Sequence, residues 1–528
     1  MSEKIQEQSR ADSRENDACR DNPSASGATH MPPTIAAVAT PPGTGGIGII
    51  RLSGPEAFAI LDRLFIPGRA INREAARAAA AGASPRRLTY GHIYGPAAGE
   101  DADEVMTVKM PRPRSYTKED VAEIHCHGGP LVLRRILGLV LESGARPAEP
   151  GEFTKRAFLN GRVDLSQAEA VMGIIGAESE RAERAALSQL NGGLAKTLGP
   201  VLDALLGLLA RIELSIDYPE HGEDEMNRAE VIEKVTRICA LIGGLEDSAE
   251  NGRVYAQGLR TVIAGRPNVG KSSLLNALVK SERAIVTDIP GTTRDALTER
   301  VLLRDIPLLL TDTAGIREAR DFIERLGVEK SLERAAEADL ILWVIDGSEG
   351  LLEEDIAALR AAAGIAGAGS AAYGPYAANA AAADTDGSGA RRVICVINKT
   401  DLPQRAEEHF IRQALNNAGL GGAVGSFCGV CAKNGAGIDG LGGGIESLFL
   451  RGDVGSGGEL ITNERHRQAV RRARERLDAA LDAARQGLPE DLLAIDLSEA
   501  YRLLGGILGK DVGEDVVDRI FSEFCVGK

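Results

Sequence analysis

One stretch near the middle of the chain constrains the fold most strongly. Residues 265–273 read G-R-P-N-V-G-K-S-S, which fits the phosphate-loop pattern G-x-x-x-x-G-K-[ST]. An apolar run precedes this loop at residues 261–264, and a helix-forming run follows it at residues 274–278. In a strand–loop–helix unit, backbone N–H groups and a helix N-terminus can surround phosphate. The pattern therefore predicts an α/β domain in which Lys271 neutralises phosphate and the Ser272 hydroxyl binds Mg²⁺.

Two further motifs follow in order, each after an apolar run typical of a buried strand. D-T-A-G occupies residues 312–315, where a D-x-x-G segment is expected on the Mg²⁺ side of the phosphates. N-K-T-D occupies residues 398–401. A carboxylate at Asp401 can accept hydrogen bonds from the guanine N1–H and 2-amino group, a donor pair that adenine lacks. The three ordered motifs together predict a GTPase.

Size and charge bound what surrounds this domain. A chain of 528 residues with 44% hydrophobic residues can form several domains, each with its own core. The formal net charge of -15 argues against a uniformly polyanion-binding surface, so nucleic acid would have to meet a local basic patch. Seven scattered cysteines predict a reducing compartment without a disulfide framework. We find no apolar run approaching 18 residues and expect no membrane span.

The region before the GTPase motifs divides into a tail, an α+β domain and helices. Residues 1–33 are polar and resemble neither a secretory signal nor a transit peptide, so we expect a disordered tail. Residues 34–54 predict two strands joined by a Pro/Gly turn, and further strands are expected at residues 88–94 and 104–110. A strand over residues 120–129 leads into a helix over residues 130–141. This mixture predicts an α+β domain.

Helical sequence flanks the GTPase motifs on both sides. Asp164 is a plausible helix start, with a long helix or two expected up to Tyr218, and a second helical stretch covers residues 228–249. After residue 457 come an arginine-rich helix (465–485) and an amphipathic one (491–509). The arginine-rich helix could meet RNA, but its interspersed acids favour a solvated face. Helices before and after the GTPase motifs suggest that the GTPase domain is inserted into a helical domain.

Two cysteine-containing patterns invite a metal hypothesis. His125-Cys126-His127 would place both histidines on one face of a strand, but no companion ligand cluster has metal-site spacing. Cys428 and Cys431 form a lone C-x-x-C, and without a second pair we do not expect a zinc or redox role.

The residue after D-x-x-G limits the mechanism. Ras-type enzymes carry a glutamine there to orient the attacking water, whereas this chain has Ile316. An isoleucine has no group that can orient water. The attacking water and the transition-state charge therefore need other partners.

Several longer segments resemble one family. They are A-T-P-P-G-T-G-G-I-G-I-I-R at 39–51, P-G-E-F-T-K-R-A-F-L-N-G-R-V-D-L at 150–165, D-I-P-G-T-T-R-D at 288–295, D-T-A-G-I-R at 312–317 and C-V-G-K at 525–528. With the phosphate loop, they make the chain similar to the MnmE (TrmE) family of tRNA modification GTPases from Thr34 to Lys528. The resemblance implies a multidomain protein: an α+β N-terminal domain that binds folate and dimerises, an all-α helical-bundle domain, and an α/β P-loop GTPase domain inserted into it. The expected boundaries are 34–158 for the first, 159–257 with 453–528 for the second, and 258–452 for the third, with a low-complexity surface insertion at 361–391.

The resemblance also implies a cation-completed active site. A potassium ion would lie where other GTPases place an arginine finger, held by side-chain or backbone oxygens of Asn268, Thr287, Ile289 and Thr292. Mg²⁺ would be held by Ser272 and Thr293. Glu324 would orient the attacking water, so Glu324, Lys271 and Thr293 are the expected catalytic residues. The residues expected around GTP come from the motifs and the segment between the first two: Asn268, Val269, Gly270, Lys271, Ser272, Ser273, Thr287, Asp288, Ile289, Pro290, Gly291, Thr292, Thr293, Asp312, Thr313, Ala314, Gly315, Asn398, Lys399, Thr400, Asp401, Cys431, Ala432 and Lys433. The last three stand where the family has S-A-K, and since the expected contact is a backbone N–H, cysteine for serine should be tolerated.

A folate of the 5-formyltetrahydrofolate type is expected in the N-terminal domain. The resemblance maps its site onto Arg51, Glu123, Arg162 and Lys528, since a glutamate can pair with pterin N–H groups and basic residues can meet the carboxylate tail. It further implies a cytoplasmic homodimer that forms a heterotetramer with MnmG, an FAD-binding partner, and acts on the wobble uridine of tRNA. The alternative is a ribosome-assembly GTPase that acts as a binding switch and uses no folate.

Overall fold

The computed structural model describes residues 32–68, 85–95, 101–217, 228–281, 298–311, 338–364, 392–450, 459–510 and 512–528. The described chain forms two compact units, one reaching to Arg162 and including Ser522–Lys528, the other spanning Val163–Phe521. The sequence-based boundaries had instead placed the C-terminal residues with the helices. The Gly527 carbonyl accepts a hydrogen bond from Arg51 Nη1 (3.3 Å), and the Cys525 carbonyl accepts one from the Gly151 N–H (3.3 Å). These bonds attach the C-terminus to the first unit.

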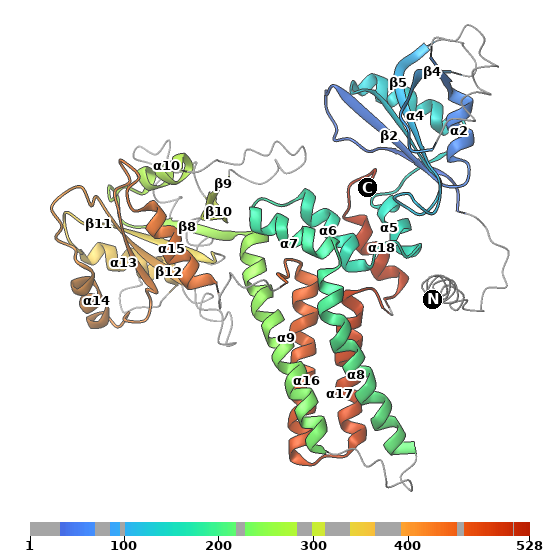
Figure 1. The fold of residues 1–528 in the computed structure, drawn as a ribbon. Helices are drawn as coiled ribbons and strands as arrows, with labels where there is room; N and C mark the ends of the chain where they lie inside the picture. The colour runs from blue at the N-terminus through green and yellow to red at the C-terminus, as the bar shows by residue number, and fades with distance from the viewer. Residues whose placement is uncertain are drawn as a thin grey trace, which may run out of the picture. The chain divides into compact units, whose positions relative to one another are not determined.

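The first unit contains a mixed sheet with strand order β3-β4-β5-β6-β2-β1-β7 (Figure 1). Neighbouring strands are antiparallel except β1 and β7, which run parallel. Helices α2 and α4 bury Leu61, Ile136 and Val140 against one face. The elements are β1 (Ile35–Val38), β2 (Ile47–Ser53), α2 (Ala57–Leu64), β3 (Phe65–Pro67), β4 (Thr89–Tyr94), β5 (Asp101–Met110), β6 (Val121–His127), α4 (Pro130–Glu142), β7 (Arg146–Pro147) and α5 (Glu152–Leu159).

The strands predicted for this unit are confirmed. The Pro/Gly segment after Val38 joins β1 to β2 in antiparallel register, with Ile35 opposite Ser53. Helix α4 begins at Pro130, where proline loses no intrahelical hydrogen bond because the first N–H groups of a helix have no partner. Local sequence therefore predicted these strands and α4, whereas α2, β3, β7 and α5 were not predicted.

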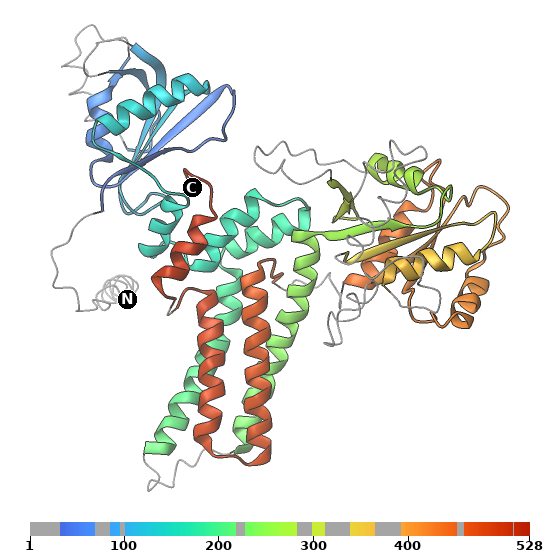
Figure 2. The ribbon, with the colours of Figure 1, turned by 180° about the vertical axis from the view of Figure 1, so that it is seen from behind.

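In the second unit, α8, α9, α16 and α17 lie side by side as a bundle (Figures 1 and 2). Their buried residues form one core, so helices that precede and follow the GTPase motifs pack together. Leu202, Ile242, Leu477 and Leu497 are all fully buried in it. The helices of this region are α6 (Leu165–Ile175), α7 (Glu180–Leu190), α8 (Gly193–Asp217), α9 (Arg228–Gln257), α16 (Glu464–Gln486), α17 (Glu490–Ile507) and α18 (Glu514–Ser522).

Three helices, not the one or two predicted, fill the stretch from Asp164 to Asp217. Asp164 caps α6 with a capping box, since its carboxylate accepts from the Gln167 N–H (2.8 Å). Ser179 caps α7 by accepting from the Ala182 N–H (3.1 Å). Gly192 has a φ of 78°, a left-handed conformation that ends α7 before α8 begins. Caps at closely spaced polar residues and glycines explain why this alanine-rich run divides.

Helix α8 is the most apolar long helix among the described residues. Its segment Gly193–Ile216 is long and apolar enough to cross a membrane by length and composition, a criterion that the core helix of a soluble protein also meets. Lys196, Asp203 and Arg211 interrupt it, so it is not the unbroken apolar run considered in the sequence analysis. Leu198, Leu202 and Leu205 are nevertheless buried against the other bundle helices, as in the core helix of a bundle.

A buried ion cluster attaches α6 to α16. The Glu169 carboxylate accepts from Arg465 Nε (2.8 Å) and Nη2 (2.7 Å) and lies 2.6 Å from His466 Nε2. The side chains of Glu169 and His466 are 6% and 0% exposed. Arg465 also donates to the carbonyls of Gly506 (2.8 Å) and Ile507 (3.0 Å) at the end of α17. Burial alone would raise the pKa of Glu169, but His466 and Arg465 outweigh it and lower that pKa to about 2.

The phosphate loop and the N-K-T-D motif lie in an α/β domain with sheet order β13-β12-β11-β8-β10-β9. All neighbours are parallel except β9 and β10. Helices α10 and α15 pack on one face, and α13 and α14 pack on the other. The elements are β8 (Leu259–Ala264), α10 (Lys271–Ser281), β9 (Thr298–Leu303), β10 (Ile306–Thr311), β11 (Leu340–Asp346), α13 (Glu353–Ala363), β12 (Arg392–Asn398), α14 (Glu408–Asn417), β13 (Ser426–Val430) and α15 (Ile438–Phe449).

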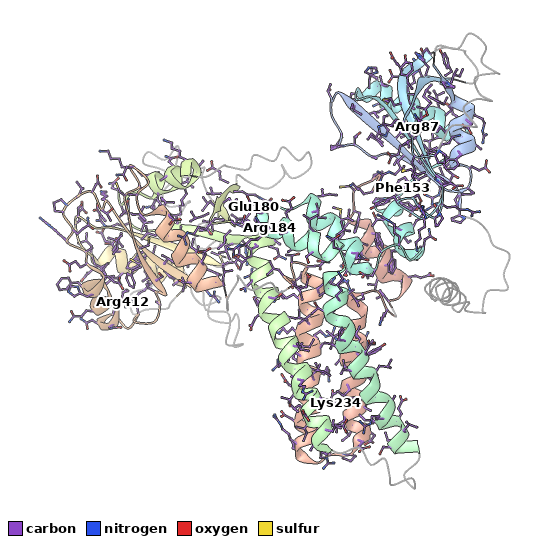
Figure 3. The ribbon with its side chains drawn as sticks, in the orientation of Figure 1. Arg87, Phe153, Glu180, Arg184, Lys234 and Arg412 are labelled. Atoms are coloured by element: carbon purple, nitrogen blue, oxygen red, sulfur yellow. The ribbon has the colours of Figure 1, made fainter. Side chains whose placement is uncertain are left out.

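This domain meets the helical region at the β9–β10 turn. Arg304 and Asp305 both have positive φ (47° and 65°), as a two-residue type I′ hairpin requires. The Asp305 carboxylate accepts from the backbone N–H groups of Glu180 and Arg181 (2.8 Å each) at the start of α7, where Figure 3 labels Glu180. Arg304 pairs with Asp439 on α15 (2.7 Å). A hairpin of the GTPase domain thus caps a helix outside it.

Helix α9 runs directly into the GTPase domain. Its 30 residues end at Gln257, and only Gly258 separates it from β8. Gly258 has a φ of 74°, and a Cβ atom there would overlap the Pro307 carbonyl oxygen. The strand that leads to the phosphate loop therefore starts one glycine beyond the bundle.

Candidate functional site

The phosphate loop connects β8 to α10, as the sequence predicted. Its two glycines are required by the backbone, since both have positive φ (148° for Gly265 and 101° for Gly270). A Cβ atom at Gly265 would overlap the Val344 carbonyl, and one at Gly270 would overlap the Asn398 side chain. The loop is thus packed tightly against the ends of two neighbouring strands.

Lys271 lies inside the loop and holds it together. Its ammonium group donates to the carbonyls of Gly265 and Arg266, both at 2.8 Å. Ser272 follows in the first turn of α10 and is exposed. A lysine and a hydroxyl at the open N-terminus of a helix suit a phosphate with its bound Mg²⁺.

Asn268 lies in the exposed part of the loop, next to Pro267. It has a φ of 64°, which asparagine tolerates better than most side chains, and it is exposed. No described residue hydrogen-bonds its side-chain amide, whereas the next residue, Val269, is fully buried. The amide oxygen of Asn268 is therefore available to a ligand.

Asn398, at the end of β12, joins the phosphate loop to the loop after β13. Its Nδ2 donates to the Val269 carbonyl (2.8 Å), and its Oδ1 accepts from the Ala432 N–H (3.1 Å). Only 2% of the surface of this asparagine is exposed, and its two hydrogen bonds make it an internal brace of the site. It fixes the phosphate side of the site relative to the base side.

Two residues predicted to contact the guanine base, Lys399 and Asp401, follow β12. Lys399 has a φ of 63° and pairs with the buried Asp346 at the end of β11. Burial would raise the pKa of Asp346, but hydrogen bonds from Lys399 and Ser348 outweigh it, so this pKa is lowered. Asp401 is exposed, and no partner for its carboxylate is found among the described residues. The Asp401 carboxylate can therefore accept hydrogen bonds from a ligand, which is the role predicted for it toward guanine.

The loop after β13 carries Cys431, Ala432 and Lys433. Cys431 is buried, and its N–H donates to the Ala436 carbonyl (2.8 Å), which closes a tight turn. The Cys431 and Cys428 thiols are free. Burial raises the pKa of the Cys428 thiol, which disfavours the thiolate that metal binding or disulfide exchange needs.

A second cluster of functional side chains lies in the first unit. Arg51 on β2 is directly opposite Glu123 on β6, and Arg51 Nε donates to the Glu123 carboxylate (2.9 Å). Arg162 Nη1 donates to the Tyr116 carbonyl (3.0 Å). The guanidinium carbons of Arg51 and Arg162 lie 5.3 and 4.7 Å from the Tyr116 ring centroid. The C-terminus joins this cluster through the bond from Arg51 to the Gly527 carbonyl, one residue before Lys528.

Sequence reasoning missed three members of this cluster. Tyr116 lies beside both arginines, and the ring centroid of Phe153, labelled in Figure 3, lies 5.8 Å from the Arg51 guanidinium carbon. His125, considered above only as a metal ligand, instead has its Nε2 3.2 Å from a Glu123 oxygen. No group of three or more metal-ligating side chains occurs in the described parts of the chain. The alternation of His125 with Glu123 on one face of β6 is the signal that could have indicated this pairing.

Comparison with known proteins identifies the family of the chain. The model for the GTP-binding protein TrmE N-terminus matches residues 34–162, and the model for the MnmE helical domain matches residues 165–525. The chain belongs to the MnmE family of tRNA modification GTPases. The MnmE proteins of Bacillus licheniformis and Bacillus subtilis are each 41% identical, and that of Geobacillus thermodenitrificans is 43% identical. Each match covers 94% of this chain and 99% or 100% of the relative.

MnmE membership leaves part of the predicted active site to residues that the structure does not describe. The expected GTP and cation ligands between the first two motifs, the D-x-x-G segment and the water-orienting glutamate all lie outside the described residues: Thr287, Asp288, Ile289, Pro290, Gly291, Thr292, Thr293, Asp312, Thr313, Ala314, Gly315 and Glu324. Residues 365–391, which make up most of the predicted insertion at 361–391, also lie outside the described residues, as does the tail up to residue 31. The described part of the predicted site comprises the phosphate loop and the residues predicted to contact the base.

The described residues fit the cations and the folate implied for an MnmE protein. The Asn268 amide oxygen is unengaged and suits a hard cation such as K⁺, and the exposed Ser272 hydroxyl suits Mg²⁺. The Tyr116 ring and the two arginines beside it offer stacking and positive charge to a flat, anionic ligand. Glu123 is shared between Arg51 and His125, so its carboxylate is held in place before any ligand arrives.

Proposed function

We propose that this chain is a potassium-activated GTPase that modifies the wobble uridine of certain tRNAs together with MnmG. It hydrolyses GTP to GDP and phosphate, and the two proteins add an aminomethyl or carboxymethylaminomethyl group to C5 of the base. The observation that best supports a guanine nucleotide is the brace formed by Asn398, which fixes the phosphate loop while Asp401 remains unengaged. Family membership supports tRNA as the macromolecule acted on.

Within this proposal the chain's own residues bind and position the nucleotide. Lys271 would exchange its two loop carbonyls for phosphate oxygens, and Asp401 would accept the two guanine N–H donors. Ser272 and Thr293 would hold Mg²⁺, which neutralises charge on the phosphates. Asn268, with Thr287, Ile289 and Thr292, would hold the potassium ion, and Glu324 would orient the attacking water.

The N-terminal cluster would bind the one-carbon carrier. Arg51, Glu123, Arg162 and Lys528 would surround a 5-formyltetrahydrofolate-type molecule, with Tyr116 as a stacking surface. We further propose a cytoplasmic homodimer that assembles with MnmG into a heterotetramer. In this architecture the GTPase domain is an insertion between α9 and α16, and hydrolysis opens and closes paired GTPase domains.

Two experiments test the proposal. Nucleoside analysis of tRNA from a strain lacking the gene should show loss of the modified uridine, which the wild-type gene restores and an Asp401→Asn variant does not. Intact modification in the deletion strain would rule out the tRNA role. Equilibrium dialysis with 5-formyltetrahydrofolate separates the proposal from a ribosome-assembly GTPase: binding that Arg51→Ala abolishes supports the folate site, and no binding to wild type favours the alternative.

A further inference from the structure

Arg266, the second residue of the phosphate loop, does not point to solvent. Its side chain is 12% exposed and lies between two carboxylates of the segment that follows β11. Its Nη2 donates to Glu349, and its Nε lies 3.2 Å from an oxygen of Asp355. Asp355 is fully buried in the first turn of α13. This arginine therefore attaches the loop to α13, which packs on the face of the sheet opposite to α10.

Asp355 is itself held firmly from other directions. Its second carboxylate oxygen accepts from the Leu352 N–H (3.0 Å), and its carbonyl accepts from the indole of the buried Trp343 (3.1 Å). Burial raises the pKa of Asp355. A buried carboxylate with one cation beside it strongly favours keeping that cation in place. Asp355 is thus a fixed anchor, and Arg266 is the part that connects it to the loop.

The backbone of Arg266 connects its ion pair with Asp355 to Lys271, the residue predicted to bind phosphate. The carbonyl of Arg266 accepts one of the two hydrogen bonds that hold the Lys271 ammonium (2.8 Å). On the other side of the loop apex, the Val269 carbonyl is held by Asn398 (2.8 Å). The exposed residues Pro267 and Asn268 lie between these two fixed points. Anchoring both sides of a short segment restrains the left-handed bend at Asn268 and the position of Lys271.

One detail distinguishes this pair from an ordinary surface salt bridge. Arg266 Nε and the nearer Asp355 oxygen are both buried, and neither has a well-directed hydrogen bond despite their 3.2 Å separation. Their attraction is electrostatic and incompletely aligned. Because an unsatisfied buried polar atom is costly, separating the two groups further would cost additional free energy.

We propose that Arg266 is a positioning residue of the phosphate loop, which acts through Asp355 to hold Lys271 and Asn268 in their nucleotide-binding arrangement. The inference rests on the proposed GTPase function and concerns the same site. It predicts that breaking the pair weakens nucleotide binding without changing which base is bound, because Lys399 and Asp401 follow β12 and Lys399 is held by Asp346 rather than by Arg266.

The test measures affinity for a fluorescent GDP analogue in the full-length protein, in KCl and in NaCl. Arg266→Ala and Asp355→Asn should each weaken binding about tenfold, and the double variant should bind no more weakly than either single one. Arg266→Lys, which keeps the charge but not the reach to both carboxylates, should lose about threefold. Preference for GDP over ADP should be unchanged in all of them.

The chain offers a matched control at the opposite end of the same strand. Arg260, at the start of β8, pairs with Asp339 (3.0 Å), as Arg266 does with Asp355 just beyond the end of that strand. Arg260→Ala should bind GDP as wild type does. Fluorescence of Trp343, the single tryptophan, reports whether each variant's GTPase domain is folded.

Affinities within about twofold of wild type in folded Arg266→Ala and Asp355→Asn would overturn the inference. An equal loss in Arg260→Ala would also overturn it, because that would indicate general destabilisation. Should Arg266→Ala fail to fold, Asp355→Asn and Arg266→Lys decide by the same criteria. Failure of the proposed potassium activation can be told apart from failure of this inference. It would appear as equal wild-type hydrolysis rates in KCl and NaCl, and the comparison of GDP affinities among the variants would still hold.

Discussion

The buried carboxylate of Glu169 gives the sharpest stability prediction. Replacing it with glutamine removes the negative charge while keeping the side chain's size. Its pKa falls from 4.5 to about 2 in the folded protein, which corresponds to about 3 kcal/mol of stabilisation at neutral pH. Removing one partner of a buried ion pair costs a similar amount, about 3–5 kcal/mol, because the remaining charges stay buried. We therefore expect Glu169→Gln to lose about 3 kcal/mol.

Urea unfolding followed by helical circular dichroism at pH 7 measures this loss. With a slope of about 1–3 kcal/mol per molar urea, the helical transition should shift down by about 1–3 M. Trp343 lies in the GTPase domain, so its fluorescence transition should move much less. The control is Glu475→Gln on α16. It removes only an exposed ion pair with Arg471 of the same helix, so this variant should unfold like wild type.

The pH dependence provides an independent check. Because the folded-state pKa is depressed, the stabilisation is complete above about pH 4.5 and is lost as the pH falls toward about 2. The difference between wild type and Glu169→Gln should thus shrink to less than about half by pH 3. A loss below about 1 kcal/mol at pH 7, or an equal difference at both pH values, would refute the reasoning.

Three further predictions concern the GTPase cycle and its connection to the helices. Hydrolysis should be much faster in K⁺ than in Na⁺, and Asn268→Ala should remove that difference; equal wild-type rates in both salts would refute the potassium assignment. Glu324→Ala should slow hydrolysis while GTP affinity stays nearly unchanged, and a large loss of binding would mean that the glutamate is structural. Asp305→Ala removes the acceptor of two N–H groups at the start of α7. It should cost that helix about 1–2 kcal/mol, seen as faster hydrogen exchange of the Glu180 and Arg181 amides; unchanged exchange would contradict the cap.

Local sequence patterns predicted the elements that carry the nucleotide motifs. The phosphate loop follows β8 and N-K-T-D begins at the end of β12, because apolar runs before glycine or polar clusters encode buried parallel strands. The helix start at Asp164 was equally readable from its capping box. These features depend on residues close together in sequence.

Features that depend on distant residues were not predictable. Nothing near Arg266 indicates its pairing with Asp355, which depends on the packing of α13 against the sheet. The contact of Tyr116 with two arginines likewise arises from three separate segments of the chain. The division of one helical run into three was missed because alanine-rich sequence favours helix on both sides of each break.

The length of helix α9 means that a small rotation near the nucleotide site would produce a large displacement at the far end of the helix. Thirty residues of continuous helix extend for about 45 Å, and one glycine joins them to the strand that ends at the phosphate loop. A turn of about 5° at Gly258 would move the distant end of that helix by about 4 Å. The helix thus acts as a lever arm. A rotation that moves atoms near the phosphates very little moves the far end of α9 by more than the diameter of a water molecule.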